Sequence, residues 1–395
     1  MKAGWQTRKL AYVLVRTETL NPEMTPDAEF DYIDVSSVSN SSFQIEQTQR
    51  IKGKDAPSRA RKLVRANDVL FATIRPTLKR IAIVPSERDS QVCSTGYFVL
   101  RTNADLHHKF LYYYLFNDSF MSQMEALQKG ASYPAVTDAE VRSQQISFPI
   151  IQEQQRIVTI LDEAFEGIAT ATANAKKNLA YARELFESYL QSVFTNKGEG
   201  WVDKTIKDLT TILGDGLHGT PQYTIDGDYY FINGNNLSDG VIELKESTKR
   251  VSVDEFNRYK KNLTDRTILV SINGTLGNVA FYNGEKVILG KSACYFNLKD
   301  EVDKNFVKYI LTSPYFLQYA HKEATGATIK NVSLKTMREF KVPLPSYVEQ
   351  QIIVNKLDTL NSETKKLEAI YQQKLFALEE LKKSILNQAF SGQLN

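Results

Sequence analysis

The sequence predicts an α+β protein made of two copies of one unit, in which a globular domain is followed by a long helix. Three observations support this prediction. The chain has 395 residues, which is long for one domain but sufficient for two that each bury a core. The sequence matches itself at a shift of about 196 residues. Within each copy, strand-like segments are followed by about 45 positions of helix-forming residues.

The internal repeat runs in order along the whole chain. Trp5 matches Trp201, and these are the only two tryptophans in the sequence. At the end of the domains, residues 148–165 match residues 344–361 without a gap. A period this long is not that of a solenoid array, so the repeat indicates two domains of one fold, related by a pseudo-twofold axis.

The boundaries follow from a change in residue character after Pro149 and Pro345. Before each proline, β-branched and aromatic runs alternate with Gly, Asn and Pro turns, as is typical of short strands. After it, helix formers continue to the end of the copy. The expected segments are a domain at 1–148, a helix at 149–197, a domain at 198–344 and a helix at 345–395.

Both helices carry a heptad pattern of apolar residues, which predicts a coiled coil. Ser346 and Glu349 form a capping box at the start of the second helix, whereas Ile150 replaces the serine in the first. The pseudo-twofold axis requires the helices to run antiparallel, with a domain at each end of a rod of about 65 Å. The expected core positions between the helices are Ile157, Leu161, Ile168, Leu185, Ile353, Leu357, Leu360, Leu367, Leu378 and Leu381.

Two polar residues interrupt this pattern at the same heptad position, Asn178 in the first helix and Lys374 in the second. A buried polar residue can fix the register of a coiled coil at some cost in stability. The alternative is that both side chains form a solvated notch in the apolar stripe.

No sequence motif indicates catalysis, a metal or a cofactor. Cys93 and Cys294 are about 200 residues apart, and the four histidines lack ligand spacing. The segment 214–219 fits GxGxxG, but Pro221 follows where a dinucleotide-binding loop continues into a helix. We therefore expect no catalytic residue, no cofactor and no metal in this chain. The apolar runs are too short for a membrane helix, so we expect a soluble, cytoplasmic protein.

A strongly basic segment lies in the first copy. Residues 50–80 hold ten basic and two acidic side chains, a net charge of +8 in a chain whose total is +3. Together with Gly53 and Pro57, this density predicts a loop that contacts DNA phosphates; the alternative is an ordinary solvated surface. The DNA-binding candidates are Arg50, Lys52, Lys54, Arg59, Arg61, Lys62, Arg75, Lys79 and Arg80.

The second copy distributes its polar candidates differently. Amide side chains can read adenine edges, and Arg and Lys can read guanine. For the amides near Asn233-Gly234, the alternative is a turn, since Asn-Gly is itself a turn signal. The DNA-binding candidates here are His218, Thr220, Gln222, Tyr223, Asn235, Asn236, Lys245, Lys249 and Arg250.

Five segments together resemble the specificity subunit of type I restriction-modification enzymes. The helix starts at 153–158 and 349–354 share an acidic-amide-amide opening, and the chain ends with LKKSILNQAFSGQL. The strings at 71–84 and 215–223 are similar to those of target-recognition domains in that family. The resemblance covers essentially the whole chain. The first copy departs from the pattern by lacking the capping serine.

The resemblance implies that each target-recognition domain reads one half of a bipartite, asymmetric DNA site. It implies that the helices set the spacer between the halves and dock two modification subunits, which carry S-adenosylmethionine. Restriction subunits would supply the chemistry that needs ATP and Mg. By the same resemblance, this chain is a non-catalytic subunit without a cofactor. The alternative from another class is a coiled-coil assembly protein whose globular modules bind protein or polysaccharide.

Overall fold

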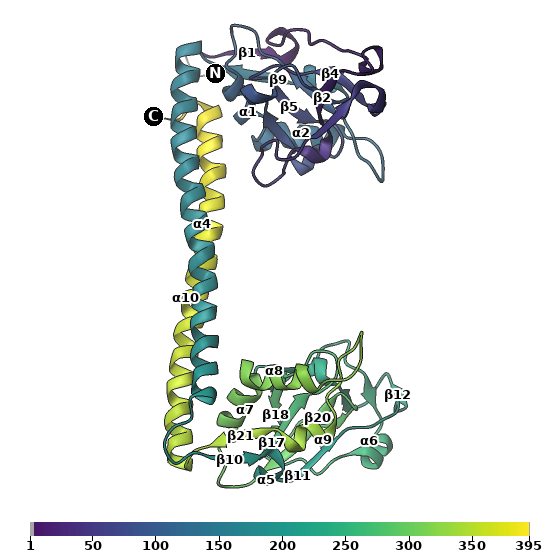
Figure 1. Ribbon diagram of the computed structural model, residues 1–395, viewed down its shortest axis with the longest axis vertical. Helices are drawn as coiled ribbons and strands as arrows, with labels where there is room; N and C mark the ends of the chain where they lie inside the picture. The colour runs from purple at the N-terminus through teal and green to yellow at the C-terminus, as the bar shows by residue number, and fades with distance from the viewer. Residues whose placement is uncertain (1–3, 395) are drawn as a thin grey trace. The chain divides into compact units, whose positions relative to one another are not determined.

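The computed structural model describes residues 4–394 and divides into two compact units. Unit 1 comprises Met1–Ala175 with Gln373–Asn395, and unit 2 comprises Lys176–Gln372. The boundary crosses both long helices, α4 (Ile151–Thr195) and α10 (Tyr347–Ser391), so each unit contains one domain and a part of each helix (Figure 1).

Unit 1 holds two main sheets and three short helices. A four-stranded sheet has the order β3-β2-β7-β4, and a three-stranded sheet has the order β6-β5-β8. Strands β1 and β9 pair beside the start of α4. The bounds are β1 (Gln6–Lys9), β2 (Glu29–Ile33), β3 (Gln49–Lys52), β4 (Ala60–Leu63), β5 (Val69–Ala72), β6 (Ile81–Ile83), β7 (Val92–Ser94), β8 (Tyr97–Leu100), β9 (Gln145–Phe148), α1 (His108–Tyr114), α2 (Asp118–Leu127) and α3 (Asp138–Arg142).

Unit 2 repeats this plan with small changes. Its sheets have the orders β11-β20-β17-β18 and β12-β16-β13-β19, with β14 paired to β15 and β10 to β21. The strands are β10 (Val202–Thr205), β11 (Thr210–Asp215), β12 (Tyr223–Thr224), β13 (Tyr229–Ile232), β14 (Leu237–Ser238), β15 (Val241–Ile242), β16 (Arg250–Val251), β17 (Thr267–Ser271), β18 (Val279–Phe281), β19 (Val287–Leu289), β20 (Ala293–Leu298) and β21 (Lys341–Leu344). The helices are α5 (Ile206–Leu209), α6 (Val253–Tyr259), α7 (Lys304–Thr312), α8 (Pro314–Glu323) and α9 (Leu334–Glu339).

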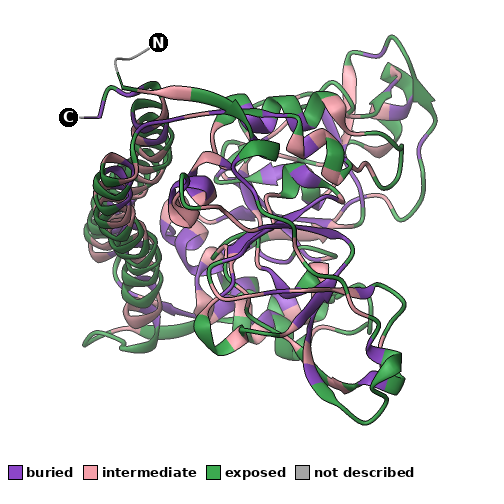
Figure 2. Ribbon diagram, turned by 90° about the horizontal axis from the view of Figure 1, so that it is seen from above, coloured by how far each residue is buried: buried purple, intermediate pink, exposed green. Residues whose placement is uncertain are grey.

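Each domain shares its core with the long helices. Strands β5 and β8 are buried along their whole length, which suits their continuous apolar runs. In unit 1, Phe110 of α1 packs in one cluster with Ile157 of α4 and Leu386 of α10. The matching cluster of unit 2 contains Phe306 and Leu190. Buried residues are coloured purple in Figure 2.

A buried glutamine joins each domain to a long helix in the same way. The Gln154 side chain accepts a hydrogen bond from the backbone N–H of His107 at 2.8 Å and donates to two carbonyl oxygens. Gln350, 196 positions later, accepts from the N–H of Asp303 at 2.8 Å and also donates to two carbonyl oxygens. Both side chains are buried, so the repeat preserves a complete set of satisfied polar groups.

The long helices pair antiparallel within each unit. In unit 1 the start of α4 packs against the end of α10, where Arg156 donates to the carbonyl oxygen of Leu394 at 3.1 Å. In unit 2 the end of α4 packs against the start of α10, with an ion pair of 3.1 Å between Arg183 and Glu368. The predicted fold class, an α+β protein with two tandem domains and paired long helices, is confirmed.

The heptad frame needs a correction, because the buried stripe advances by nearly one residue along each helix. Leu185, Leu367 and Leu381 are exposed, whereas Leu190 and Leu386 are buried. A straight helix drifts by about 20° per heptad against a strict seven-residue repeat, and over four heptads this approaches one residue. Of the other expected core positions, Ile157, Leu161 and Leu357 are buried, and Ile168, Ile353, Leu360 and Leu378 are half-buried.

The same drift decides the role of the two polar interruptions. Asn178 and Lys374 are both exposed, while the next residues, Leu179 and Leu375, are half-buried. The two polar side chains therefore form solvated notches, as the alternative reading held, and do not fix the register.

Candidate nucleic-acid interface

The basic segment 50–80 of unit 1 is not the single loop that we expected. It passes through β3, β4 and β5 with short 3-10 turns at Gly53–Asp55 and Pro76–Leu78. The sheets therefore separate its cations and give each one a different environment.

Three of the predicted cations are exposed and unpaired. The side chains of Lys52, Lys54 and Arg59 have no hydrogen bond or ion pair to any residue between 4 and 394. Lys52 ends β3, Lys54 lies in the following 3-10 turn, and Arg59 precedes β4. Their charges remain available to an anionic partner such as a phosphate backbone.

Two predicted cations are instead engaged inside the domain, and we correct their assignment. The Lys62 ammonium donates to Asp138 at 2.8 Å and to the Tyr97 carbonyl oxygen at 2.6 Å. The Arg80 guanidinium donates to the carbonyl oxygens of residues 35, 36 and 38, at distances of 2.6–3.3 Å. Their bonds cross from one segment to another, so these two side chains hold the domain together.

The remaining cations of the segment are intermediate cases. Arg50 is exposed but lies within 3.3 Å of Glu29 and 3.8 Å of Asp31. Arg61 donates to the neighbouring Ala60 carbonyl oxygen at 2.9 Å. Arg75 is exposed and contacts the tip of a nearby loop, and Lys79 is half-buried at a pocket.

Unit 2 brings its candidates together on a strand pair. Tyr223 of β12 lies opposite Val251 of β16, so Arg250 lies on the strand beside it and Lys249 directly precedes that strand. The Lys249 ammonium is 5.9 Å from the Tyr223 ring centroid, and the Arg250 guanidinium is 5.3 Å from that of Tyr230. All three candidates are exposed. Alternating cations and aromatic rings suit a surface that binds nucleic acid.

The other candidates of unit 2 are exposed loop residues. Thr220, Gln222 and Asn235 are exposed. His218 is exposed and lies 2.6 Å from Asp215, and Lys245 pairs with Glu243 at 3.2 Å.

Asn236 needs a correction, because its side chain is part of a turn. Its Oδ1 accepts from the backbone N–H of Asn233 at 3.0 Å, and its Nδ2 donates to the Glu243 carbonyl oxygen at 3.0 Å. These bonds cap the 3-10 turn Gly234–Asn236, which is the outcome that the Asn-Gly turn signal favoured.

Two aromatic residues, the exposed Tyr133 and the half-buried Tyr230, escaped the sequence analysis. Tyr133 lies between Gly130 and Pro134, and the flanking turn formers could have indicated an exposed tip. Tyr230 contacts Arg250 because β13 and β16 are neighbours, which no local pattern reveals.

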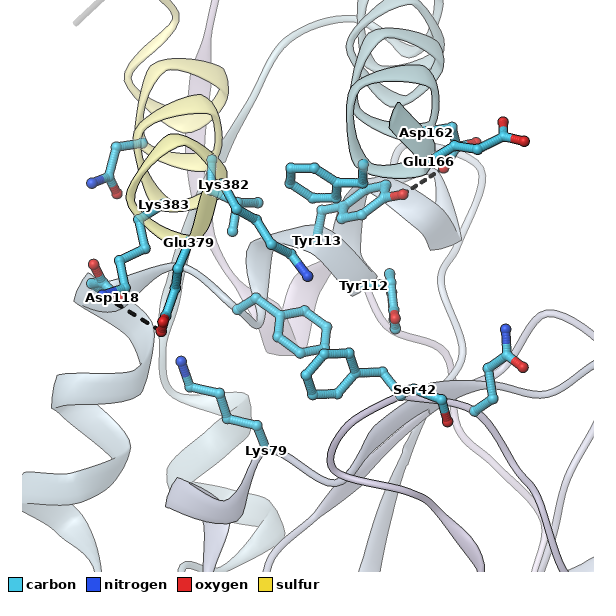
Figure 3. A pocket seen from close by; sticks show the side chains of 16 residues that line it. Ser42, Lys79, Tyr112, Tyr113, Asp118, Asp162, Glu166, Glu379, Lys382 and Lys383 are labelled. Atoms are coloured by element: carbon cyan, nitrogen blue, oxygen red, sulfur yellow. Dashed lines mark hydrogen bonds and ion pairs between the residues drawn. The ribbon is translucent and has the colours of Figure 1, made fainter. Parts of the chain in front are cut away.

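A pocket of about 530 Å³ lies in unit 1, where the segment 42–44, α1, α4 and α10 meet (Figure 3). The Lys382 ammonium lies 5.4 Å from the Phe43 ring centroid and 5.1 Å from that of Phe165. Burial, with a smaller contribution from the charge of Lys79, lowers the pKa of Lys382. Acidic and basic side chains are mixed along its wall, so the pocket is a joint between elements with no dominant charge.

The metal-ligating and thiol side chains of the described residues are the groups that a reactive site would use. Within residues 4–394, no three His, Cys, Asp or Glu side chains are grouped so that they could hold a metal ion. Burial raises the pKa of the Cys93 thiol to about 12 and also raises the pKa of Cys294, so neither is a ready thiolate nucleophile. No described helix is both long and apolar enough to cross a membrane.

Comparison with known proteins gives a family for both units. The model of the type I restriction modification DNA specificity domain matches residues 3–179 and again residues 198–375. The chain is 26% identical over 213 residues to the StySPI specificity subunit of Salmonella potsdam and to the EcoKI specificity subunit of Escherichia coli. These matches cover 50% of this chain and 44% of each relative, so the chain spans about half the length of these relatives.

Solved structures match the whole chain. A chain from a study titled as the structural basis of complex assembly and conformational transition of the type I R-M system has a TM-score of 0.85 and 27% identity, covering 100% of this chain and 99% of that one. The HsdS subunit from Thermoanaerobacter tengcongensis has a TM-score of 0.73 and 27% identity, covering 100% and 98%. This chain therefore belongs to the type I restriction modification DNA specificity family and carries two copies of its domain.

Proposed function

We propose that this protein is the sequence-specific DNA-binding subunit of a type I restriction-modification complex, and that each domain reads one half of a bipartite, asymmetric site. One observation carries the proposal. The scaffold repeats between the units, down to the bonds of Gln154 and Gln350, whereas the exposed polar surface does not. One fold with two different surfaces favours two different half-sites over a palindrome.

Exposed cations supply the affinity in this proposal. Lys52, Lys54 and Arg59 in unit 1 contact phosphates, while Tyr223, Lys249 and Arg250 form the corresponding surface in unit 2. Such contacts release counterions, so binding weakens steeply with salt. Lys62, Arg80 and Asn236 are left out because their polar groups are already bonded within the domains.

The remaining parts of the chain assemble the complex. We infer that residues 1–148 and 198–344 are the target-recognition domains, and that the helical segments 149–197 and 345–395 set the spacer and dock two modification subunits. S-adenosylmethionine, ATP and Mg belong to the modification and restriction subunits, and this chain acts without catalysis of its own in the cytoplasm. The similarity to a chain solved in work on complex assembly of the type I R-M system supports this proposal.

The test is a footprint of the chain assembled with its modification subunit, on a site found by mapping DNA methylation in cells. We expect protection of two unequal half-sites. Lys54→Gln with Arg59→Gln should lower the slope of log affinity against log salt by about 2. The control pair Lys9→Gln with Arg16→Gln, also exposed in unit 1, should leave the slope unchanged. Equal binding to scrambled duplexes at moderate salt would contradict the proposal.

A further inference from the structure

Each domain contains a short hairpin of the same design before its last helix and strand. In unit 1, the backbones of Lys129 and Ala135 exchange two hydrogen bonds of 2.9 Å, and in unit 2 Thr325 and Asn331 do the same at 2.9 Å. Both hairpins turn at a glycine with positive φ, Gly130 at 107° and Gly326 at 96°. The backbone geometry of this tip is therefore common to both units.

A second loop braces the hairpin in both units. In unit 1, Val136 donates its N–H to the Thr73 carbonyl oxygen at 2.9 Å, and Arg75 donates to that of Pro134 at 2.7 Å. In unit 2, Val332 donates to Ile272 at 2.8 Å, and Gly274 donates to Lys330 at 2.9 Å. These bonds identify Arg75 and Gly274 as structurally equivalent positions.

The two units place different residues at this position, although its backbone is left-handed in both. Gly274 has φ 76°, which glycine adopts without steric cost, whereas Arg75 has φ 50° and carries the clash of its Cβ. Strain of this kind persists where the surrounding structure imposes it, and it concentrates at functional sites. A functional role of the Arg75 side chain would explain why this strain is retained.

The Arg75 guanidinium lies over an exposed ring. Its Cζ lies 4.8 Å from the Tyr133 ring centroid, and its Nη2 donates to the Ser132 carbonyl oxygen at 3.1 Å. Tyr133 is 71% exposed, and Ile329 at the same place in unit 2 is 60% exposed. A guanidinium has five N–H donors, and only the one to Ser132 is used within residues 4–394, so the others remain available to a ligand.

This tip adjoins a cation of the proposed DNA surface. Thr73, just before Arg75, donates its N–H to the Gly96 carbonyl oxygen at 2.9 Å, and the adjacent Thr95 donates to that of Arg59 at 2.8 Å. Hydrogen bonds thus connect these three segments, and Arg59 and Arg75 are both exposed. A phosphate contact at Arg59 would bring the base edges of a duplex toward Arg75.

We propose that Arg75, stacked on Tyr133, is a specificity-determining residue that reads a guanine edge in the half-site of unit 1. A planar, oriented guanidinium matches the two acceptors that guanine presents in the major groove. Unit 2 has Ile329 and Gly274 at these two positions, so it lacks the guanidinium–ring pair, although the exposed Lys330 lies next to Ile329. We therefore expect no matching guanidinium contact in its half-site. This inference rests on the proposed function and names the residues behind one base preference.

The test converts the tip of unit 1 into that of unit 2 with Arg75→Gly and Tyr133→Ile, singly and together. The controls are Arg16→Gly and Tyr12→Ile, because Arg16 is exposed and Tyr12 is 70% exposed in the same unit. Each variant is assembled with the modification subunits. Its affinity is measured for the mapped site and for duplexes with every single-base change in both half-sites.

We expect Arg75→Gly to lose about tenfold in discrimination at one G·C pair of one half-site, with the other half-site unchanged. Tyr133→Ile should show a smaller loss at the same pair, since it frees the guanidinium to rotate. The thermal unfolding midpoint of Arg75→Gly should not fall, because glycine relieves the left-handed strain, so a binding loss cannot be attributed to misfolding.

Two results would overturn the inference while the proposed function stands. One is unchanged discrimination in both tip variants relative to the controls. The other is an equal loss of affinity on matched and scrambled duplexes, which would make Arg75 a phosphate contact. A parent complex that binds every duplex equally would instead overturn the proposed function, and this inference with it.

Discussion

The two units brace a hairpin against the long helix by different forces. In unit 1 this second hairpin is closed by the bridge between Val38 and Ile45 and follows the 3-10 turn Val35–Ser37. Phe43 near its tip has φ 57°. The Phe43 ring meets that of Phe116 edge-on at 4.7 Å and lies beneath the Lys382 ammonium of α10. We call this contact between hairpin and helix the joint of unit 1, and aromatic packing and a cation–π contact form it.

In unit 2 the hairpin β14–β15 follows the 3-10 turn Gly234–Asn236, and its tip residue Asp239 has φ 42°. The Asp239 carboxylate pairs with Lys308 of α7 at 3.1 Å and with Lys365 of α10 at 2.7 Å. Burial raises the pKa of Asp239, but its bonds to Lys365 and Lys308 outweigh burial and hold the pKa below its ordinary value. The repeat therefore preserves the position of the joint but not its chemistry.

The two tryptophans provide one reporter for each unit. The Trp5 ring lies 6.3 Å from that of Phe110 in unit 1, and the Trp201 ring lies 6.4 Å from that of Phe306 in unit 2. A Trp201→Phe background follows unit 1 by fluorescence, and a Trp5→Phe background follows unit 2. Urea unfolding in these two backgrounds compares the joints directly.

The largest effect is expected in the helix seam, where the units should behave alike. Leu190→Ala in unit 2 and Leu386→Ala in unit 1 should each lower the free energy of unfolding by about 3 kcal/mol, because both side chains are buried. Leu185→Ala and Leu381→Ala, at exposed positions that a strict heptad puts in the seam, should cost less than about 0.5 kcal/mol. Equal costs for Leu185→Ala and Leu190→Ala on α4, and for Leu381→Ala and Leu386→Ala on α10, would restore the strict heptad.

Substitution of the buried glutamines should have the next largest effect on the free energy of unfolding, and the effect should be equal in the two units. Gln154→Leu and Gln350→Leu should each cost about 2 kcal/mol, since each change leaves buried backbone groups without partners. The measurement is the unfolding midpoint of the corresponding unit in its single-tryptophan background. If the two costs differed by more than the error of the fits, the two glutamines would not be equivalent.

Substitutions in the two joints should affect the units differently, in contrast to those in the seam and at the glutamines. Phe43→Ala should lower the free energy of unfolding of unit 1 by about 1.5 kcal/mol, because a half-buried ring loses its packing. The cost should be nearly the same at low and high salt, since dispersion and burial are not screened. A cost that vanished in 1 M salt would assign this joint to electrostatics after all.

The smallest effect belongs to the ionic joint. Asp239→Asn should cost unit 2 about 0.5 kcal/mol at low salt and almost nothing at high salt, because exposed ion pairs are weak and screened. The pKa of Asp239 is lower in the folded state, so its contribution is present above a pH of about 4 and is lost as pH falls through the folded pKa. An unfolding series from pH 7 to pH 3 should therefore bring the parent and Asp239→Asn curves together.

Much of the architecture could be predicted because it depends on order along the chain. The matching of Trp5 with Trp201, and of residues 148–165 with 344–361, is a property of sequence alone, as is the change to helix formers after each proline. Local periodicity then identifies the long helices. The exact buried stripe could not be predicted, because its phase depends on whether the pair coils or runs straight.

The sequence by itself determined a duplicated α+β chain with two long helices and a concentration of positive charge between residues 50 and 80. Only the tertiary structure decided which of those charges are available. Lys62 is engaged by Asp138 and Arg80 by carbonyl oxygens about 40 residues away, whereas Arg75 is displayed on Tyr133, 58 positions along the chain. Charge is a property of each residue, but its availability depends on partners that the fold brings from distant segments.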